Sequence, residues 1–178
     1  MAEAVGDQRV LFNLLTNGAW LALQQKNPTR ATVLLREALQ YATDLGYQEG
    51  VAYGLECLAE AEAFDPTGPS RAARLFGAAH ALRDTLSLPV WPARLAAYEQ
   101  AVARVRRTLG EPAFAEHWQA GQAMAAADAL TFALERRDHR TAPSPDTALA
   151  RLSRREREVA GLIARGYTSR EIAETLVI

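Results

Sequence analysis

Apolar residues recur every three or four positions along most of the chain, which is the spacing of amphipathic helices. In the first such segment, about residues 9–26, the apolar stripe consists of Val10, Leu11, Leu14, Leu15, Trp20 and Leu21. Six further segments follow, at about 30–45, 48–64, 70–86, 92–109, from 111 up to Gly121, and 125–137. Alanine and leucine dominate and β-branched residues are sparse, so the pattern predicts an all-α protein.

The breaks between these segments carry residues that start or stop helices. Asn27-Pro28 separates the first two segments, and Gly46 follows the second as an expected C-terminal cap. A turn-forming cluster occupies 65–70, two prolines interrupt 88–92, and Gly110 ends the fifth segment. We therefore expect antiparallel helices joined by short connections.

The first four segments form an internal repeat. A shift of 41 residues superimposes Pro28 on Pro69, Arg30 on Arg71, Ala31 on Ala72, Leu34 on Leu75, Ala38 on Ala79 and Leu45 on Leu86, and also Val10 on Val51 and Leu14 on Leu55. A single helix pair cannot bury its apolar face, whereas a stacked second pair covers it. The architecture resembles tetratricopeptide-type repeats, with a unit longer than their usual length of roughly 34 residues.

Composition narrows the function of the chain. It has 178 residues and a net charge of −1, which excludes a globally basic nucleic-acid binder. No run approaches the roughly 18 apolar residues of a membrane span, and the first residues do not resemble a secretory leader, so we expect a cytoplasmic protein without a membrane. Cys57, the only cysteine, excludes an intramolecular disulfide and a multi-thiolate metal site.

The character of the sequence changes after residue 137. Residues 138–150 are polar, contain two prolines and show no apolar period, which predicts a linker. The expected organisation is therefore a tetratricopeptide-like helical array at 1–137, a linker at 138–150, and a separate small unit at 151–178.

The last segment contains two short helices with explicit ends. Ser153 and Glu156 form a capping box at the start of the first helix, and Gly166 closes that helix. Thr168 and Glu171 form a second capping box. Two caps around one glycine predict a helix-turn-helix geometry.

This segment resembles the first half of a LuxR-type DNA-binding domain. The resemblance implies a helix-turn-helix scaffold at Leu152, Ser153, Glu156, Val159, Leu162, Gly166, Thr168, Glu171, Ile172, Ala173 and Leu176. More loosely, 1–137 resembles the helical-repeat region that precedes this domain in large multidomain LuxR-type regulators. The resemblance implies a transcriptional regulator whose partner is DNA.

The match ends before the part of the domain that reads DNA sequence. A LuxR-type domain has four helices, of which the third enters the major groove, and this chain reaches only the second. Base contacts specify a site, whereas phosphate contacts only position the protein. The resemblance implies phosphate contacts at Thr168, Ser169 and Arg170, at the start of a helix. We expect sequence-specific DNA binding only from a completed domain.

An arginine-rich run at the start of this segment has two interpretations. Arg151, Arg154, Arg155 and Arg157 form a phosphate-binding patch, or they lie on a solvated face and pair with Glu156 and Glu158 at helical spacing.

The remaining chemistry-bearing residues have structural interpretations. We expect core packing from a set of aromatic side chains, Trp20, Trp91, Trp118, Phe76 and Phe114, and a buried, inert thiol at Cys57. His80, His117 and His139 lack metal-ligand spacing, and no nucleophile motif is present. The sequence therefore predicts no enzyme, no metal and no cofactor.

Two functions of different classes remain open. The first is a transcription-regulator fragment, in which the helical array senses or relays and the terminal domain binds DNA. The second is a helical-repeat protein-interaction module without DNA binding. Either function allows a protein partner or effector on the array, and a homodimer.

Overall fold

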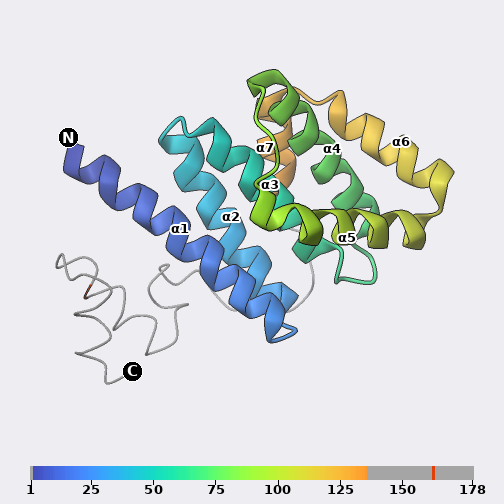
Figure 1. Cartoon of the computed structure of the whole chain (residues 1–178), viewed down its shortest axis with the longest axis horizontal. Coiled ribbons are helices and arrows are strands. Elements are labelled where there is room, and N and C mark those ends of the chain that lie inside the picture. The colour runs from blue at the N-terminus through green and yellow to red at the C-terminus, as the bar shows by residue number, and fades with distance from the viewer. Residues whose placement is uncertain (1, 136–161, 163–178) are drawn as a thin grey trace. The chain divides into compact units, whose positions relative to one another are not determined.

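The computed structural model describes residues 2–135 and Leu162. The chain divides into two compact units, Met1–Arg136 and Arg137–Ile178. Within the described residues every regular element is a helix, which confirms the predicted all-α class (Figure 1). The seven helices are α1 Ala2–Gln24, α2 Pro28–Asp44, α3 Gln48–Glu62, α4 Pro69–Leu86, α5 Pro92–Leu109, α6 Glu111–Gln122 and α7 Ala126–Leu134.

Local chemistry explains where most of these helices begin and end. The side chain of Asn27 accepts a hydrogen bond from the backbone N–H of Arg30 at 3.0 Å, and Pro28 occupies the first helical position of α2. Gly46 adopts φ +63° beyond the end of α2, as expected for a left-handed cap. The two hydrogen bonds of a Schellman motif accompany it, from Gly46 N–H to Thr43 O and from Tyr47 N–H to Ala42 O.

Helices α1 to α4 pack in chain order, each against the next. The 41-residue repeat preserves burial at three positions of α2 and α4, although buried Leu39 corresponds to the partly exposed His80. All three equivalent pairs on their inner faces are fully buried, namely Ala31 with Ala72, Leu34 with Leu75, and Ala38 with Ala79. Leu34 and Leu75 therefore fill equivalent places in the core.

The predicted stripe of α1 is wrong in part, since Leu15 is buried and Leu11 and Leu14 are partly buried, but its other members are exposed. Val10, Trp20 and Leu21 are exposed by 41%, 53% and 42%, while α1 buries a neighbouring set, Phe12, Leu15, Thr16, Ala19 and Ala22. Apolar residues lie on both sides of α1, so periodicity alone does not separate the buried residues from the exposed ones. Trp20 is therefore no core anchor. Trp91, exposed by 42%, is also not buried as predicted, because it lies at the start of α5.

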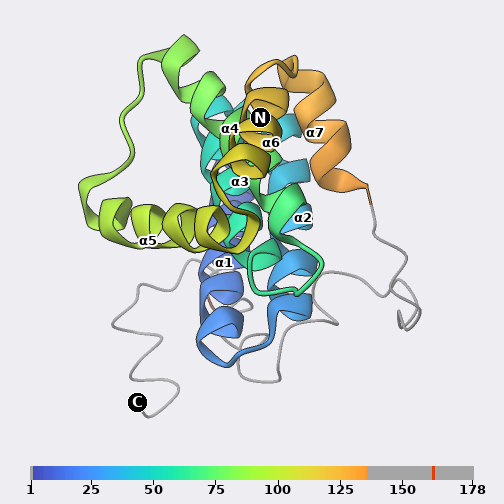
Figure 2. The same ribbon diagram turned by 90° about the vertical axis from the view of Figure 1, so that its right-hand side faces the viewer.

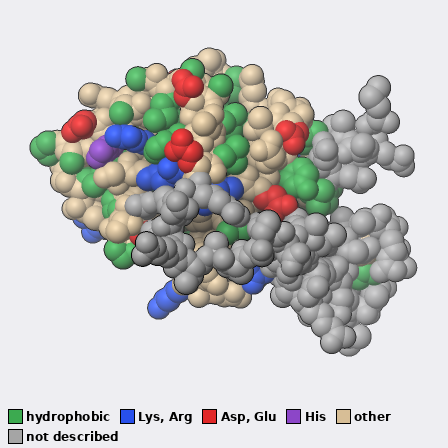
Figure 3. All heavy atoms as spheres, turned by 180° about the vertical axis from the view of Figure 1, so that it is seen from behind, with side chains coloured by type: hydrophobic (Ala, Val, Ile, Leu, Met, Phe, Trp, Pro, Cys, Tyr) green, Lys and Arg blue, Asp and Glu red, His purple; other side chains and the backbone are tan. Residues whose placement is uncertain are grey.

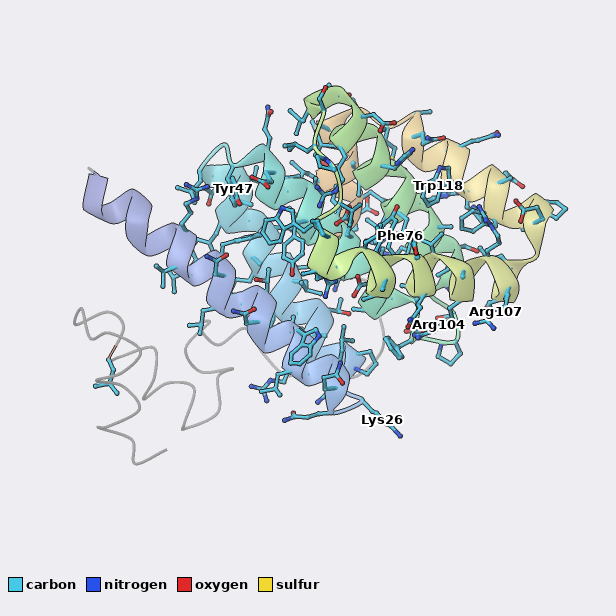
Figure 4. All side chains as sticks on the ribbon, viewed as in Figure 1. Lys26, Tyr47, Phe76, Arg104, Arg107 and Trp118 are labelled. Carbon is cyan, nitrogen blue, oxygen red and sulfur yellow. The ribbon has the colours of Figure 1, made fainter. Side chains whose placement is uncertain are left out.

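Phe76 and Phe114 are buried and Trp118 is partly buried, so these three aromatic side chains do pack as predicted. Figure 4 labels Phe76 and Trp118. Phe76 meets Tyr98 of α5 edge to face, with ring centroids 5.5 Å apart. Trp118 contacts the rings of Phe114 and His80.

Glycine allows α4 and α6 to approach closely. A β-carbon on Gly77 would lie 2.2 Å from the carbonyl oxygen of Trp118, and one on Gly121 would lie 2.0 Å from that of Arg74. Gly121 is the residue at which the sixth predicted segment ends. It lies instead inside the last turn of α6, where its missing side chain brings the two backbones together.

Helices α5 and α7 lie on opposite sides of α3 and α4 (Figure 2). Helix α7 is shorter than the predicted 125–137 segment, and its last carbonyl groups are taken up by side chains of other helices. Among the described residues, no helix has the length and apolarity needed to cross a bilayer.

Candidate functional site

The residues predicted to meet DNA lie outside the described part of the chain. This applies to Thr168, Ser169 and Arg170, to the arginine-rich run, and to the helix-turn-helix scaffold positions other than Leu162. Leu162 is helical and 4% exposed. The site that the structure does describe is therefore on the helical array.

Two arginines hold the C-terminal end of α7. Arg71 of α4 donates from Nη2 to the carbonyl oxygens of Phe132, Ala133 and Glu135, and Arg36 of α2 donates from Nε to that of Ala133 at 3.1 Å. The last carbonyls of a helix lack partners within the helix, and cations there also favour its dipole. We call this set of contacts the α7 clamp.

A buried acid lies between the two arginines of the α7 clamp. Glu62, 4% exposed at the end of α3, has its Oε1 3.2 Å from Nη2 of Arg36 and 3.3 Å from Nε of Arg71. The guanidinium of Arg71 also lies 4.2 Å from the centre of the Phe132 ring, which adds a cation–π contact. The α7 clamp thus joins α2, α3, α4 and α7 in one polar network.

The α7 clamp holds the last described helix before the 138–150 segment. A nine-residue helix is unstable by itself in water, so its formation depends on docking. Ala129 and Ala133 are its buried residues, and the α7 clamp adds the directional part of the docking. The array can therefore determine where the chain leaves it.

A second polar cluster lies between α3 and α5. Arg94 donates to Glu60 and lies 3.8 Å from the Sγ of Cys57. Burial, and then the charge of Glu60, raise the pKa of Cys57 to about 12, and burial also raises the pKa of Glu60. A thiol that stays protonated is a poor nucleophile and metal ligand. The structure thus agrees with a buried, inert Cys57.

The ring of Trp91 lies beside this cluster and is linked to it by Tyr53, over whose ring the guanidinium of Arg94 lies. It stacks on Tyr53 with centroids 5.2 Å apart, and its Nε1 donates to Oε1 of Glu49 at 3.0 Å. Its partial exposure therefore reflects a position at the rim of the α3–α5 contact rather than in the core.

A buried ion pair links α3 to α4. Arg83 donates from Nε and Nη2 to the two carboxylate oxygens of Glu56, and both residues are 4% exposed. Burial alone would lower the pKa of Arg83, but the hydrogen bond and charge of Glu56 raise it overall. Arg83 also donates to the carbonyl oxygen of Pro89 at 3.0 Å, which fixes the start of the loop between α4 and α5. The pair serves as a structural crosslink.

The exposed side of α1 is apolar. Val10, Leu14, Trp20 and Leu21 form what we call the outer face of α1, on which Leu14 is partly buried and the others are exposed. Exposed Asn13 and Asn17 lie among them. By contrast, the face of the molecule drawn in Figure 3 mixes acidic, basic and apolar side chains over its described part.

Sequence reasoning missed the α7 clamp. The repeat placed Arg71 at the position of Arg30, but a repeat gives no information about a contact with α7, which lies outside it. No three His, Cys, Asp or Glu side chains come together as a metal site in the part of the chain that the structure describes.

No protein-family model matches this chain, and no solved structure matches it significantly. Curated relatives do match it. One protein of Mycobacterium bovis and proteins from two strains of Mycobacterium tuberculosis are each 28% identical to it over 167 residues. The match covers 92% of this chain and 18% of each relative, so the chain spans about a fifth of their length. All three are named as candidate HTH-type transcriptional regulators.

Proposed function

We propose that this chain is the region of an HTH-type transcriptional regulator in which a helical array joins the DNA-binding domain. The observation that carries the proposal is the match over 92% of the chain to relatives with that name. The LuxR-like pattern of capping boxes and apolar positions at 152–176 supports the finer assignment to the LuxR type. A regulator of this kind acts in the cytoplasm and needs no enzymatic activity.

In this proposal the tetratricopeptide-like array receives a partner or effector, and the segment at 151–178 contributes to DNA binding. Thr168, Ser169 and Arg170 contact phosphate groups at the start of the second helix of that segment. The α7 clamp supports a coupling between the two parts, because it fixes the helix from which the connecting chain departs.

The test uses the full-length product of the gene that encodes this chain. Its binding to duplex DNA from its own upstream region is titrated at several salt concentrations, alongside a random duplex. Replacing a phosphate-contacting arginine, Arg170→Ala, should weaken binding to every duplex and reduce the salt slope by about 1. A matched control is Arg107→Ala, which removes an exposed arginine from α5 (Figure 4) and should leave binding unchanged.

Two outcomes contradict the proposal. The first is full-length protein that prefers no duplex and binds none more tightly than the nonspecific range of about 10⁻⁴–10⁻⁶ M. The second is an equal effect of Arg107→Ala and Arg170→Ala, which would exclude a dedicated contact at the second helix.

A protein-interaction module without DNA binding is the second candidate. Its support is the outer face of α1, whose exposed apolar side chains would be available to a protein partner if no further helix of the same polypeptide covered them. This candidate would be selected if the full-length protein prefers no DNA duplex in the titration above but still forms a complex with a protein partner.

A further inference from the structure

The repeat allows the outer face of α1 to be compared with an equivalent face that is covered. A shift of 41 residues carries Val10 to Val51, Leu14 to Leu55 and Trp20 to Ala61. These three positions of α3 are 7%, 1% and 1% exposed, whereas Val10 and Trp20 of α1 are 41% and 53% exposed. The same face of the repeat is therefore covered on α3 and exposed on α1.

On α3 this face is covered by the helix that comes before it. A β-carbon on Gly54, which lies in the same stripe, would be 2.7 Å from Cδ2 of Leu39 in α2. At the end of the stripe, Glu62 pairs with Arg36 of α2. No described helix covers the outer face of α1. The contacts of α1 with α2 and α3 are made through its opposite face.

We propose that the outer face of α1 is the docking surface for a further helix pair of the same repeat, whose second helix packs on α1 as α2 packs on α3. The proposal does not depend on the regulator function. Its support is the continuity of an interface already present once in the array, because stacked repeats bury each helix pair against the next.

The size of the face argues for this occupant and against a second copy of the chain. The exposed apolar residues of this face lie in a narrow strip along a single helix, whereas a standard protein–protein interface is a broad patch of roughly 800 Å² on each partner. A further repeat in the same polypeptide needs no such area, since it pays no association entropy. The curated relatives, of which the match covers 18%, have length for additional repeats.

The side chains on the face define the occupant more closely. Asn13 of α1 stands where α3 has Gly54, the residue against which Leu39 of α2 packs. Trp20 stands where α3 has Ala61. The covering helix therefore carries a residue smaller than leucine at the position of Leu39, and an apolar residue rather than arginine opposite Leu21.

The test adds such a pair to the chain. Residues 7–47 are placed directly before residues 7–178, and the added copy carries Leu39→Ala and Arg36→Leu to fit Asn13 and Leu21. In the original copy, Leu21→Cys supplies a thiol on the outer face of α1. Cys57 is buried and serves as an internal unreactive reference. We expect the Leu21→Cys thiol to react at least 10-fold more slowly with a thiol reagent in the extended chain than in the 178-residue chain.

The matched control is Gln25→Cys, which lies on an exposed residue whose repeat equivalent, Pro66, is also exposed. Its reactivity should be the same in both chains. Equal reactivity of Leu21→Cys in a folded extended chain would overturn the proposal. So would a stable dimer of the 178-residue chain that Val10→Glu dissociates, because the occupant would then be a second copy.

A second measurement decides the matter if the extended chain does not fold. Peptide-resolved thiol labelling of the full-length gene product compares Leu21→Cys with Gln25→Cys. Protection of the first alone supports the proposal, and equal labelling of both overturns it.

Discussion

Helices α2 and α4 bury three equivalent positions of the repeat alike, whereas α1 and α3 differ at their equivalent valines. Ala31, Leu34 and Ala38 of α2 are as fully buried as their partners in α4. Val10 of α1 is exposed while Val51 of α3 is buried. Both comparisons involve the same 41-residue shift, so the place of a helix in the stack, as well as its sequence, decides which face is covered.

The inner positions of α1 and α3 differ in chemistry as well. Leu15 of α1 and Glu56 of α3 occupy equivalent positions, and they are 3% and 4% exposed. Helix α3 tolerates a buried acid there because Arg83 of α4 donates two hydrogen bonds to it. The repeat thus preserves shape while exchanging an apolar contact for an ion pair.

The largest expected effect comes from breaking that ion pair. Glu56→Leu restores the residue type found in α1 but leaves Arg83 buried without its acid, so the free energy of unfolding should fall by about 3–5 kcal/mol. The double variant Glu56→Leu/Arg83→Leu should recover most of this loss. Urea unfolding followed by circular dichroism measures both, and a single variant as stable as the parent would contradict the buried pair.

The next effect tests the equivalence of α2 and α4. Leu34→Ala and Leu75→Ala each remove a fully buried side chain and should each cost about 2–5 kcal/mol of unfolding free energy. The same urea titrations apply. If one substitution costs less than about 1 kcal/mol while the other is severe, the two leucines do not occupy equivalent places.

A smaller change in stability is expected from replacing glycine by alanine, and its sign should differ between Gly77 and Gly18. Gly77→Ala places a methyl group against the backbone of α6 and should cost about 1–3 kcal/mol. Gly18→Ala in α1 meets only the end of the Leu34 side chain at 3.4 Å, and alanine stands at the equivalent Ala59. It should stabilise the array by about 0.5–1 kcal/mol. Thermal unfolding compares the two variants, and a destabilising Gly18→Ala would show that α1 and α2 pack more tightly than described.

Sequence patterns predicted most elements because their ends are chemically local. Asn27, Gly46 and Gly110 act through their own backbone or side chain, so their effects need no knowledge of neighbours. The 41-residue repeat likewise paired buried Ala31, Leu34 and Ala38 with buried residues of α4, although Leu45 and Leu86, which it also pairs, are only partly buried. Periodicity succeeded only in part for α1, where Leu15 is buried but Val10, Trp20 and Leu21 are exposed, because both sides of the helix are apolar and the packing partner decides.

Contacts between elements distant in sequence could not be predicted. Arg36 donates to the carbonyl oxygen of Ala133, 97 residues away, and Arg71 to that of Phe132, 61 residues away. Nothing in the local sequence of α7 indicates these contacts. Gly121 was misread for a similar reason, since its role is set by the backbone of Arg74. The DNA-contact positions and the LuxR type remain predictions.

The most direct test of the account compares one residue type at two equivalent positions. Val10→Ala and Val51→Ala make the same chemical change, on the outer face of α1 and on the covered face of α3. Unfolding free energies from urea titration should fall by about 1.5 kcal/mol for Val51→Ala and by less than about 0.5 kcal/mol for Val10→Ala. Equal losses at the two positions would contradict the claim that only one of these faces is covered in this chain.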